Sequence, residues 1–227
     1  MPRTFVHKCH SGYDSLVTAR ESYEVATRFF FGDYYARLRL VEGKVTRGKD
    51  LFGKSEYFLG VSIKPRGVDF ELFHQSKQAE NCYGPFSKVG PDNMVNFSED
   101  SSELSFAWAD EDRTLWEGWL NSALSLTHSD LVIRIEFYVG ERALFGVGFS
   151  DNLIFQKQYY ILSNSQSDLY LFTGEEFAEP GGEAKGQKLL FDGTGWTFDV
   201  GGSGFVGTFR IELAQQPLLG EKQFLSP

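Results

Sequence analysis

Hydrophobic and polar residues alternate along much of the second half of the chain. In Leu131–Val139 every second residue is apolar, and Arg134 and Glu136 stand between apolar neighbours. Alternation of this kind places one set of side chains on the core face of a strand and the other set on its solvent face. We therefore expect a strand over 131–139 and, after a turn at 140–141, a returning strand to Phe149 that completes a hairpin.

The same period-two pattern predicts strands elsewhere in the chain. Their aromatic and β-branched residues suit a pleated, half-buried surface. These predicted strands are Tyr35–Val41, Tyr57–Ile63, Val68–Phe73, Leu104–Trp108, Leu153–Leu162, Leu169–Thr173 and Lys188–Phe191.

Two segments have the three- and four-residue spacing of an amphipathic helix. One is Asp14–Phe30, although its aromatic and β-branched residues also suit a strand. The other is Glu111–Leu124, where Leu115, Trp116, Trp119 and Leu120 would share one side. The acidic residues at its start suit the positive end of a helix dipole.

Together these elements predict one domain over 1–227 of the all-β, mainly antiparallel class. The expected architecture is a two-sheet β-sandwich resembling a jelly roll, with one or two short helices, and a closed β-barrel is the alternative. An aromatic content of 16% with 24 glycines agrees with pleated surfaces joined by tight turns.

A glycine-rich stretch near the end of the chain, Gly202–Gly207, has the spacing GxGxxG of a phosphate-binding loop. A dinucleotide fingerprint must open a helix, but Thr208–Leu213 alternates like a strand. A kinase glycine loop needs a lysine strand and a catalytic loop after it, and only 20 residues follow Gly207. We therefore expect a hairpin of Trp196–Val200 and Phe205–Leu213 whose glycines permit positive φ angles in the turn.

The charge of the chain limits its partners. A formal net charge of -9 argues against binding to nucleic acid, even though Arg37 and Arg39 begin a run of basic residues that extends to Lys54. The charge is divided unevenly, because residues 1–66 carry a net +5 and residues 67–227 a net -14. Such an imbalance favours electrostatic self-association into a homo-oligomer as an alternative role.

Membrane, compartment and metal signals are weak. No stretch is long and apolar enough to span a membrane, and the first residues have no apolar signal segment, so we expect a cytoplasmic protein. Cys9 and Cys82 are expected to be buried thiols, with a single bridge between them as the alternative. His7, Cys9 and His10 match no zinc-site spacing, and Asp110–Asp112 and Asp192–Gly195 match no EF-hand loop, so we expect no metal and no cofactor.

Two carboxylates are the candidates for acid and base chemistry. Glu136 and Glu212 each lie on the polar face of a predicted strand, and each follows an arginine on that face, Arg134 or Arg210. If their strands paired, the two carboxylates could flank a sugar as in a carbohydrate-active hydrolase. The structural interpretation is that Arg and Glu side chains on neighbouring strands form ordinary cross-strand ion pairs.

Aromatic residues and arginines are the candidates for ligand binding. Large rings combine apolar area with polar tips, which suits the faces of sugar rings. We expect Trp116 and Trp196 to be exposed beside polar turns, and Trp108 and Trp119 to lie in the core. The predicted ligand-binding residues are Trp116, Trp196, Arg134, Arg210, Tyr159 and Tyr170.

The leading functional hypothesis is a noncatalytic protein that binds carbohydrate or another small polar ligand. The chain lacks the motif sets of lipases, kinases, zinc proteases and Rossmann enzymes. A self-associating structural protein is the alternative, and a hydrolase that uses Glu136 and Glu212 is the third hypothesis.

Overall fold

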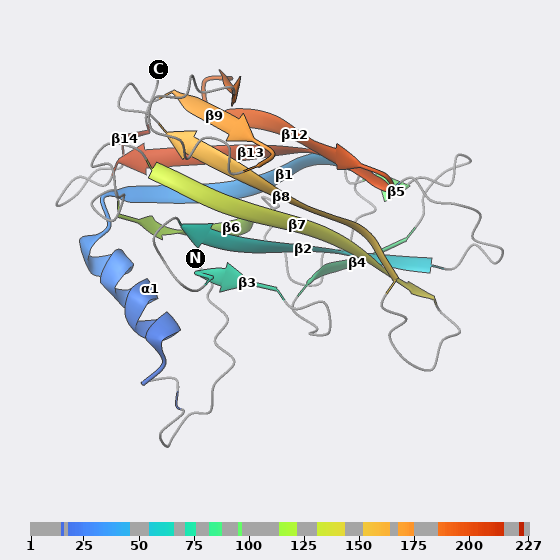
Figure 1. Ribbon diagram of the computed structural model, residues 1–227, viewed down its shortest axis with the longest axis horizontal. Helices are drawn as coiled ribbons and strands as arrows, with labels where there is room; N and C mark the ends of the chain where they lie inside the picture. The colour runs from blue at the N-terminus through green and yellow to red at the C-terminus, as the bar shows by residue number, and fades with distance from the viewer. Residues whose placement is uncertain are drawn as a thin grey trace.

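Two antiparallel β-sheets packed face to face make up most of the described part of the protein (Figure 1). The computed structural model describes residues 15, 18–45, 55–65, 71–75, 82–87, 95–96, 114–121, 131–143, 152–163, 168–174, 186–215 and 223–224. The predicted β-sandwich class is confirmed. The alternative of a closed barrel is wrong for these residues, because the strands form two separate sheets.

The first sheet is built around the pairing of an early strand with a late one. Its members are β1 (Tyr34–Val45), β5 (Val95–Asn96), β6 (Thr114–Leu120), β11 (Leu190–Phe191), β12 (Trp196–Gly202), β13 (Phe205–Gln215) and β14 (Gln223–Phe224). They follow the order β11-β12-β13-β1-β5, with β6 paired to β1 and β14 paired to β13. Thus β1 lies between β13 on one side and both β5 and β6 on the other.

The second sheet is built around the strand that contains the predicted segment 131–139. Its members are β2 (Ser55–Pro65), β3 (Phe73–His74), β4 (Tyr83–Ser87), β7 (Leu131–Ala143), β8 (Asn152–Ser163), β9 (Leu169–Phe172) and β10 (Gln187–Lys188). They follow the order β10-β9-β8-β7-β2-β3, with β4 also paired to β2.

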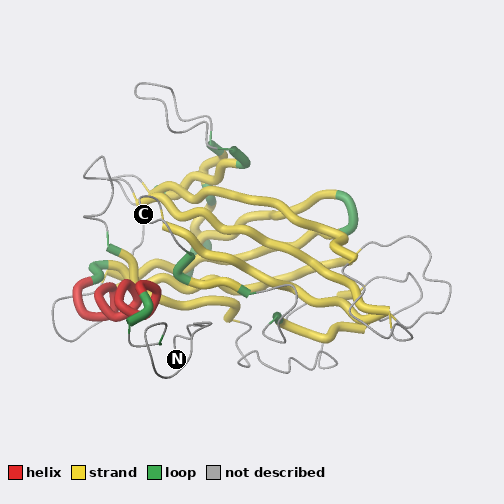
Figure 2. The backbone as a smooth tube through the Cα atoms, turned by 60° about the horizontal axis from the view of Figure 1, so that its bottom comes forward, coloured by secondary structure: helices red, strands yellow, loops and turns green. Residues whose placement is uncertain are grey.

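The helix α1 (Arg20–Phe31) lies at one end of the sandwich (Figure 2). It confirms the predicted helix at 14–30 from Arg20 onwards, whereas Ser15, Thr18 and Ala19 precede the helix. After Gly32 the chain is attached to β6 by a hydrogen bond from the Asp33 amide to the Leu120 carbonyl, 3.0 Å long. Inside the helix, Arg28 is buried and its Nη1 lies 2.7 Å from Oε2 of Glu24.

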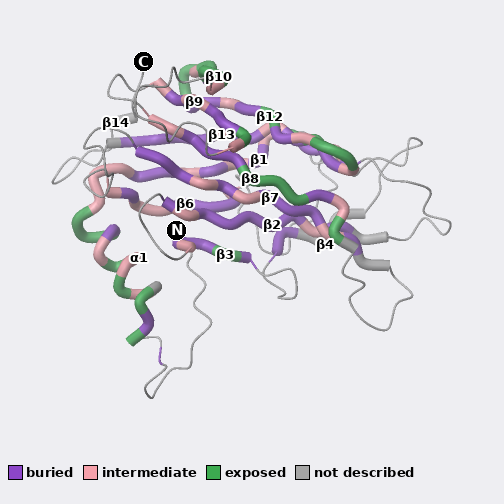
Figure 3. Tube along the Cα trace, viewed as in Figure 1, coloured by how far each residue is buried: buried purple, intermediate pink, exposed green. Residues whose placement is uncertain are grey.

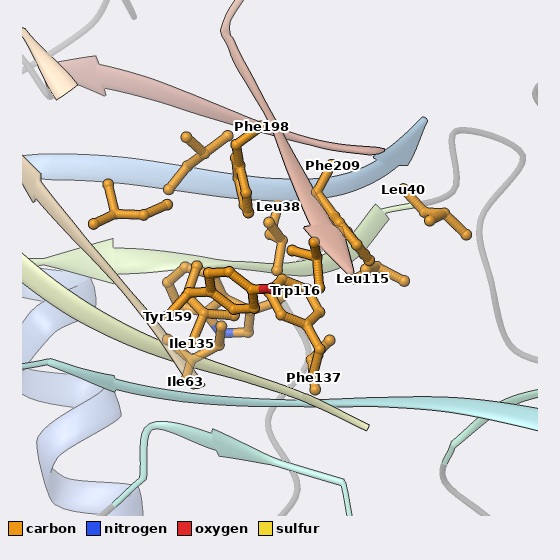
Figure 4. Close-up of a cluster of buried hydrophobic side chains, with 14 of the residues drawn as sticks. Leu38, Leu40, Ile63, Leu115, Trp116, Ile135, Phe137, Tyr159, Phe198 and Phe209 are labelled. Carbon is orange, nitrogen blue, oxygen red and sulfur yellow. The ribbon is translucent and has the colours of Figure 1, made fainter. Parts of the chain in front are cut away.

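The core lies between the sheets, where alternate residues of the long strands are buried (Figure 3). Figure 4 shows Phe137 of the second sheet close to Phe198 and Phe209 of the first. Phe137 and Phe209 are completely buried, as the period-two alternation around them predicts. Large aromatic rings from both sheets therefore fill this layer.

The predicted helix at 111–124 is wrong where the structure describes it, because residues 114–120 form β6. This strand pairs with β1, and its register shifts beside Leu115 and Trp116. At such a bulge two successive residues oppose one partner, so both can turn towards the core. The bulge lets a strand imitate helical spacing: Leu115, Trp116 and Leu120 are buried although the segment is extended.

The predicted turn at 140–141 is also wrong. Strand β7 continues through it to Ala143 and pairs with β2 as far as Ser55. The glycine and the polar residue after it coincide with a register shift against β8 between Val139 and Gly140. A glycine followed by a polar residue can therefore mark an irregularity within a strand as well as a turn. The predicted returning strand falls on 144–149, outside the described residues.

The predicted strands at 35–41, 57–63, 153–162 and 169–173 are confirmed, and the strand predicted at 188–191 needs revision. Residues 188–191 were expected to form one strand, but β10 pairs with β9 in the second sheet and β11 pairs with β12 in the first. The chain therefore passes from one sheet to the other at Leu189. The strand predicted at 104–108 and residues 68–70 of that predicted at 68–73 lie outside the described residues, and of residues 71–73 only Phe73 belongs to a strand, β3.

The glycine-rich stretch is a β-hairpin, as predicted. Strands β12 and β13 pair from Trp196 opposite Ile211 to Gly202 opposite Phe205. Gly204, in the turn, has a φ of 92°. The chain continues as β13, so there is no helix N-terminus to receive a phosphate after Gly207.

Within the residues described, no helix has both the length and the apolar character needed to cross a membrane.

Candidate functional site

The outer face of the first sheet, which points away from the core, carries a row of charged side chains. Glu117 of β6 and Glu212 of β13 lie opposite Arg37 of β1, one on each side. Arg37 Nε lies 3.6 Å from Glu117 Oε2, and Arg37 Nη1 lies 3.5 Å from Glu212 Oε2. Glu117, Arg37 and Glu212 are called the ionic row below.

The carboxylates of the ionic row are buried, whereas its arginine is partly accessible to solvent. The side chains of Glu117 and Glu212 are only 8% exposed, whereas that of Arg37 is 29% exposed. Carboxylates buried to this extent are tolerated when cations and hydrogen bonds compensate for lost water. Arg39 contributes to this compensation, because its Nη1 lies 3.5 Å from Glu212 Oε1. The row therefore holds its carboxylates in fixed positions beside an accessible guanidinium group.

Tyr35 joins the ionic row to its aromatic neighbours. Its hydroxyl donates a hydrogen bond to Glu117, and its ring lies 5.9 Å from the Arg37 guanidinium carbon. Burial, followed by the bond to Glu117, raises the pKa of Tyr35 to about 12. Burial by itself would raise the pKa of Glu117. Hydrogen bonds, among them the one from Tyr35, and positive charge, including that of Arg37, outweigh burial, so the pKa of Glu117 is lowered. At neutral pH the phenol is thus a donor and the carboxylate an acceptor.

An aromatic corner adjoins the ionic row where α1 meets β6. It consists of Tyr35, Trp119 and Phe29. The Trp119 ring packs edge-on against Phe29 with centroids 4.7 Å apart and against Tyr35 with centroids 5.5 Å apart. Trp119 is half-buried and Phe29 is exposed, so the prediction that Trp119 lies in the core is wrong. Apolar ring surface thus borders fixed hydrogen-bonding groups on this face.

The predicted ligand residue Arg210 lies on the same face, on β13. Its Nη2 lies 2.9 Å from Oδ2 of Asp192, and Asp192 Oδ1 accepts bonds from the amides of Thr194 and Gly195 and from the Thr194 hydroxyl. Gly195 leaves space for the side chains of Arg210 and Glu212, because a Cβ there would lie 3.0 Å from Cγ of each. Asp192 therefore holds the turn between β11 and β12 through Oδ1 and ties it to β13 through Oδ2.

Three predicted ligand residues lie in the core instead of on the surface. Trp116 is 5% exposed and Trp196 is 2% exposed, so the prediction that both are exposed beside turns is wrong. Each stands at an inward position of its strand, opposite Leu38 and Ile211 respectively. The alternation of inward and outward positions along each strand, and not the polar turn nearby, therefore determines that both tryptophans are buried.

Tyr159 connects the two sheets. It is buried, and its hydroxyl accepts a hydrogen bond of 3.1 Å from the Gly201 amide of β12. Its ring packs edge-on against Phe137 at 6.1 Å. These contacts give Tyr159 a structural role between β8 and β12.

The other predicted residues lie on the outer face of the second sheet. Glu136 accepts a hydrogen bond from Gln156 Nε2. Arg134 Nη2 lies 2.9 Å from Oε1 of Glu71. Tyr170 is partly buried against a separate apolar cluster that contains Tyr160. This face therefore holds cross-strand pairs of the ordinary structural kind.

Glu136 and Glu212 do not converge. Glu136 belongs to β7 of the second sheet and Glu212 to β13 of the first. Phe137 and Phe209, which lie on the opposite faces of these strands from Glu136 and Glu212, meet in the core, so each carboxylate points away from the other. The assumed pairing of their strands is wrong, and with it the geometry of a shared hydrolytic cleft.

Sequence reasoning missed Phe29, Tyr35, Arg37 and Arg39 as site residues, and it also missed Glu117 and Trp119 of β6. The helix predicted over this segment hid both, since it placed Trp119 with buried Trp116. If the segment had been taken as a strand, alternation counted from the inward-facing Leu120 would have placed Glu117 and Trp119 together on the outer face. No group of three or more His, Cys, Asp or Glu residues suited to a metal ion occurs within the described ranges.

Comparison with known proteins finds no matching family model, no matching curated protein and no matching solved structure.

Proposed function

We propose that the protein is a noncatalytic binding module that recognises carbohydrate or another small polar ligand on the outer face of its first sheet. The observation that carries the proposal is the ionic row beside the aromatic corner. Fixed carboxylates of Glu117 and Glu212 flank the accessible Arg37 on adjacent strands.

The chemistry of this face suits a polyhydroxylated ligand. Carboxylates accept hydrogen bonds from hydroxyl groups, and a guanidinium group donates them in a planar fork. A sugar also has apolar faces, which the half-buried Trp119 can cover. Because the acidic side chains are already held by Arg37 and Arg39, little conformational entropy is lost when a ligand binds.

A glycan array followed by thermal unfolding with the selected sugars tests the proposal. Binding to the folded state raises the melting temperature. We expect Trp119→Ala and Glu117→Gln to abolish the rise, because they remove the stacking surface and a fixed acceptor. Glu136→Gln, on the outer face of the second sheet, is the matched control and should retain it. Absence of any sugar or polyol that stabilises the wild-type protein would contradict the proposal, as would equal binding by Trp119→Ala.

Self-association is a second candidate function, favoured by the exposed surface of α1. Phe30 and Phe31 are 69% and 73% exposed at its C-terminal end. Exposed apolar surface of this kind is typical of contact sites. Light scattering at low and high salt tests this role. Self-association through these rings would persist at high salt and be lost in a variant with both Phe30→Ser and Phe31→Ser. Self-association between the oppositely charged halves would instead be lost at high salt.

A further inference from the structure

Gly32 lies where the C-terminal end of α1 meets the end of β6, at a point that has no room for a side chain (Figure 1). A Cβ at this position would lie 2.9 Å from the Leu120 carbonyl oxygen and 3.0 Å from Cβ of Trp119, and it would also overlap the Arg28 carbonyl oxygen. Two of these three atoms are backbone atoms and the third is a Cβ, so none of them can rotate away. The glycine therefore brings α1 into direct contact with the strand that carries Trp119.

Two backbone hydrogen bonds hold this junction. The Gly32 amide donates to the Arg28 carbonyl at 2.8 Å and so closes the last turn of the helix. The amide of the next residue, Asp33, donates to the Leu120 carbonyl at 3.0 Å and fastens the end of the helix to β6. Leu120 is completely buried, so its carbonyl belongs to a fixed part of the sheet. The end of α1 therefore has one defined position relative to β6.

The Trp119 ring is held between two other rings. Phe29, three residues before Gly32 and on the same side of the helix, packs against it at an interplanar angle of 87°. Tyr35 of β1 packs against it at 63°. Edge-to-face contacts of this kind are specific in their geometry, because the positive edge of one ring meets the negative face of the other. The position of α1 therefore determines how the Trp119 ring is oriented.

Packing against the sandwich, and not intrinsic helix stability, keeps α1 in place. The helix has 12 residues, and a helix of that length is marginal in water without tertiary packing. Its N-cap residue, Ala19, provides no side-chain cap. Val25 packs against the main core, and Phe29, one turn later, packs against Trp119. The contacts of the helix with Trp119 are therefore part of what holds the helix on the sandwich.

We propose that α1 is a clamp that fixes the Trp119 ring in its binding orientation, and that Gly32 is the positioning residue that allows this contact. The inference rests on the proposed function, in which Trp119 supplies the apolar surface for a sugar, and it names the element that controls that site. A displaced helix would leave the ring free to rotate, so a ligand would have to immobilise the ring on binding. Binding should then weaken by about two- to tenfold, while the ionic row stays intact.

The experiment is fluorine NMR of protein labelled with 5-fluorotryptophan, which reports on each tryptophan ring without any ligand. The chain has four tryptophans, and Trp119→Phe identifies the resonance of Trp119 by its loss. We expect Gly32→Ala to shift or broaden this resonance, because the added Cβ pushes the helix away from the ring. The resonances of Trp116 and Trp196, identified in the same way, should stay in place because both rings are buried in the core.

A second set of variants keeps the glycine and changes only the ring partner. Phe29→Leu removes the aromatic edge and should also move the Trp119 resonance, whereas Phe29→Tyr retains the ring and should leave the resonance near its wild-type position. Phe31→Ala is the matched control, because Phe31 is exposed at the same end of the helix and its ring packs against Phe30. It should leave the resonance of Trp119 unchanged. Circular dichroism confirms that each variant is folded.

Binding is measured by calorimetry with the saccharide that most raises the melting temperature of the wild-type protein. Gly32→Ala and Phe29→Leu should each weaken binding by about two- to tenfold. Phe31→Ala should leave the affinity for the same saccharide unaltered.

Each outcome separates the clamp from the proposed function. An unmoved Trp119 resonance in both Gly32→Ala and Phe29→Leu would overturn the clamp, whatever the protein binds. An equal shift in Phe31→Ala would also overturn it, because the effect would then not depend on contact with the ring. A moved resonance with unchanged affinity would overturn the role of ring orientation in binding. A moved resonance in a protein that binds no saccharide would refute the proposed function and still support control of the ring by α1.

Discussion

Phe137 of β7 and Phe209 of β13 pack against one another across the two sheets, with ring centroids 4.2 Å apart. Neither strand pairs with the other, so this contact joins sheets that share no backbone hydrogen bonds along these strands. We expect Phe209→Ala to lower the free energy of unfolding by about 3–5 kcal/mol, through lost burial and a residual cavity. Urea titration measures the change.

Two further variants make this prediction specific. Phe209→Leu, which retains much of the volume, should cost less than the alanine variant and remain folded. Val206→Ala, at an exposed position of the same strand, should change the free energy of unfolding by no more than about 0.5 kcal/mol. Equal effects of Phe209→Ala and Val206→Ala would refute a core role for the ring pair.

The hairpin of β12 and β13 depends on a glycine in its turn. Gly204 has a φ of 92°, and a Cβ there would lie 2.7 Å from the Ile154 carbonyl oxygen. Gly193 has a φ of 97° but nothing within 4 Å of the same position. We expect both alanine variants to be destabilised by backbone strain of about 1–2 kcal/mol, and Gly204→Ala to lose more because of the contact with Ile154. Thermal unfolding of the two variants side by side gives the comparison, and a larger loss in Gly193→Ala would contradict it.

Stability at high pH should depend on Tyr35. Its pKa is raised to about 12 in the folded protein, chiefly by burial, against about 10 for an exposed tyrosine. Between these values the unfolded chain releases the proton while the folded chain keeps it, so the free energy of unfolding falls as pH rises. The contribution of the phenol is therefore complete below pH 10 and lost towards pH 12.

Tyr35→Phe isolates this effect. Its free energy of unfolding should decline less steeply than that of the wild type between pH 10 and pH 12, as measured by denaturant titration at each pH. Tyr23→Phe, at an exposed tyrosine, should follow the wild-type curve. Parallel curves for wild type and Tyr35→Phe would show that the proton on Tyr35 is not held by the fold.

The Cys82 thiol should be protected by Tyr138. Its sulfur lies 3.6 Å from the Tyr138 hydroxyl, and burial raises its pKa. The Tyr138 ring covers Gly60, where a Cβ would lie 2.0 Å from Tyr138 Cζ. We expect Gly60→Ala to displace the ring and to speed reaction of Cys82 with a thiol reagent, measured in a Cys9→Ser background under native conditions. Gly140→Ala, where a Cβ has open space, is the control, and no acceleration in Gly60→Ala would contradict the covering role.

Alternation in the sequence was sufficient to predict the long strands and the hairpin of β12 and β13. It was sufficient because one face of each strand is buried against the other sheet, as at Phe137 and Phe209, so the pattern records the packing directly. It failed at β6, where one bulge brings Leu115 and Trp116 to the same side and produces the spacing of a helix.

The candidate site could be predicted only in part, because register is a property of paired strands. Arg210 and Glu212 were visible as polar residues of a strand, but nothing local indicates that Arg39 lies opposite Arg210 or that Glu117 lies opposite Arg37. Those partners are distant in sequence, since the contact of Arg37 with Glu212 joins residues 175 positions apart.

That separation also determines when the first sheet can form. Strand β1 is made well before β13, so its pairing with β13 must wait until residues 205–215 have left the ribosome. Contacts between such distant residues are slow to close and leave one edge of β1 unpaired until β13 is made. Nascent chains that end before Phe205 should therefore depend on chaperones to keep the edge of β1 from aggregating, and folding should become cooperative only when the last long strand is added.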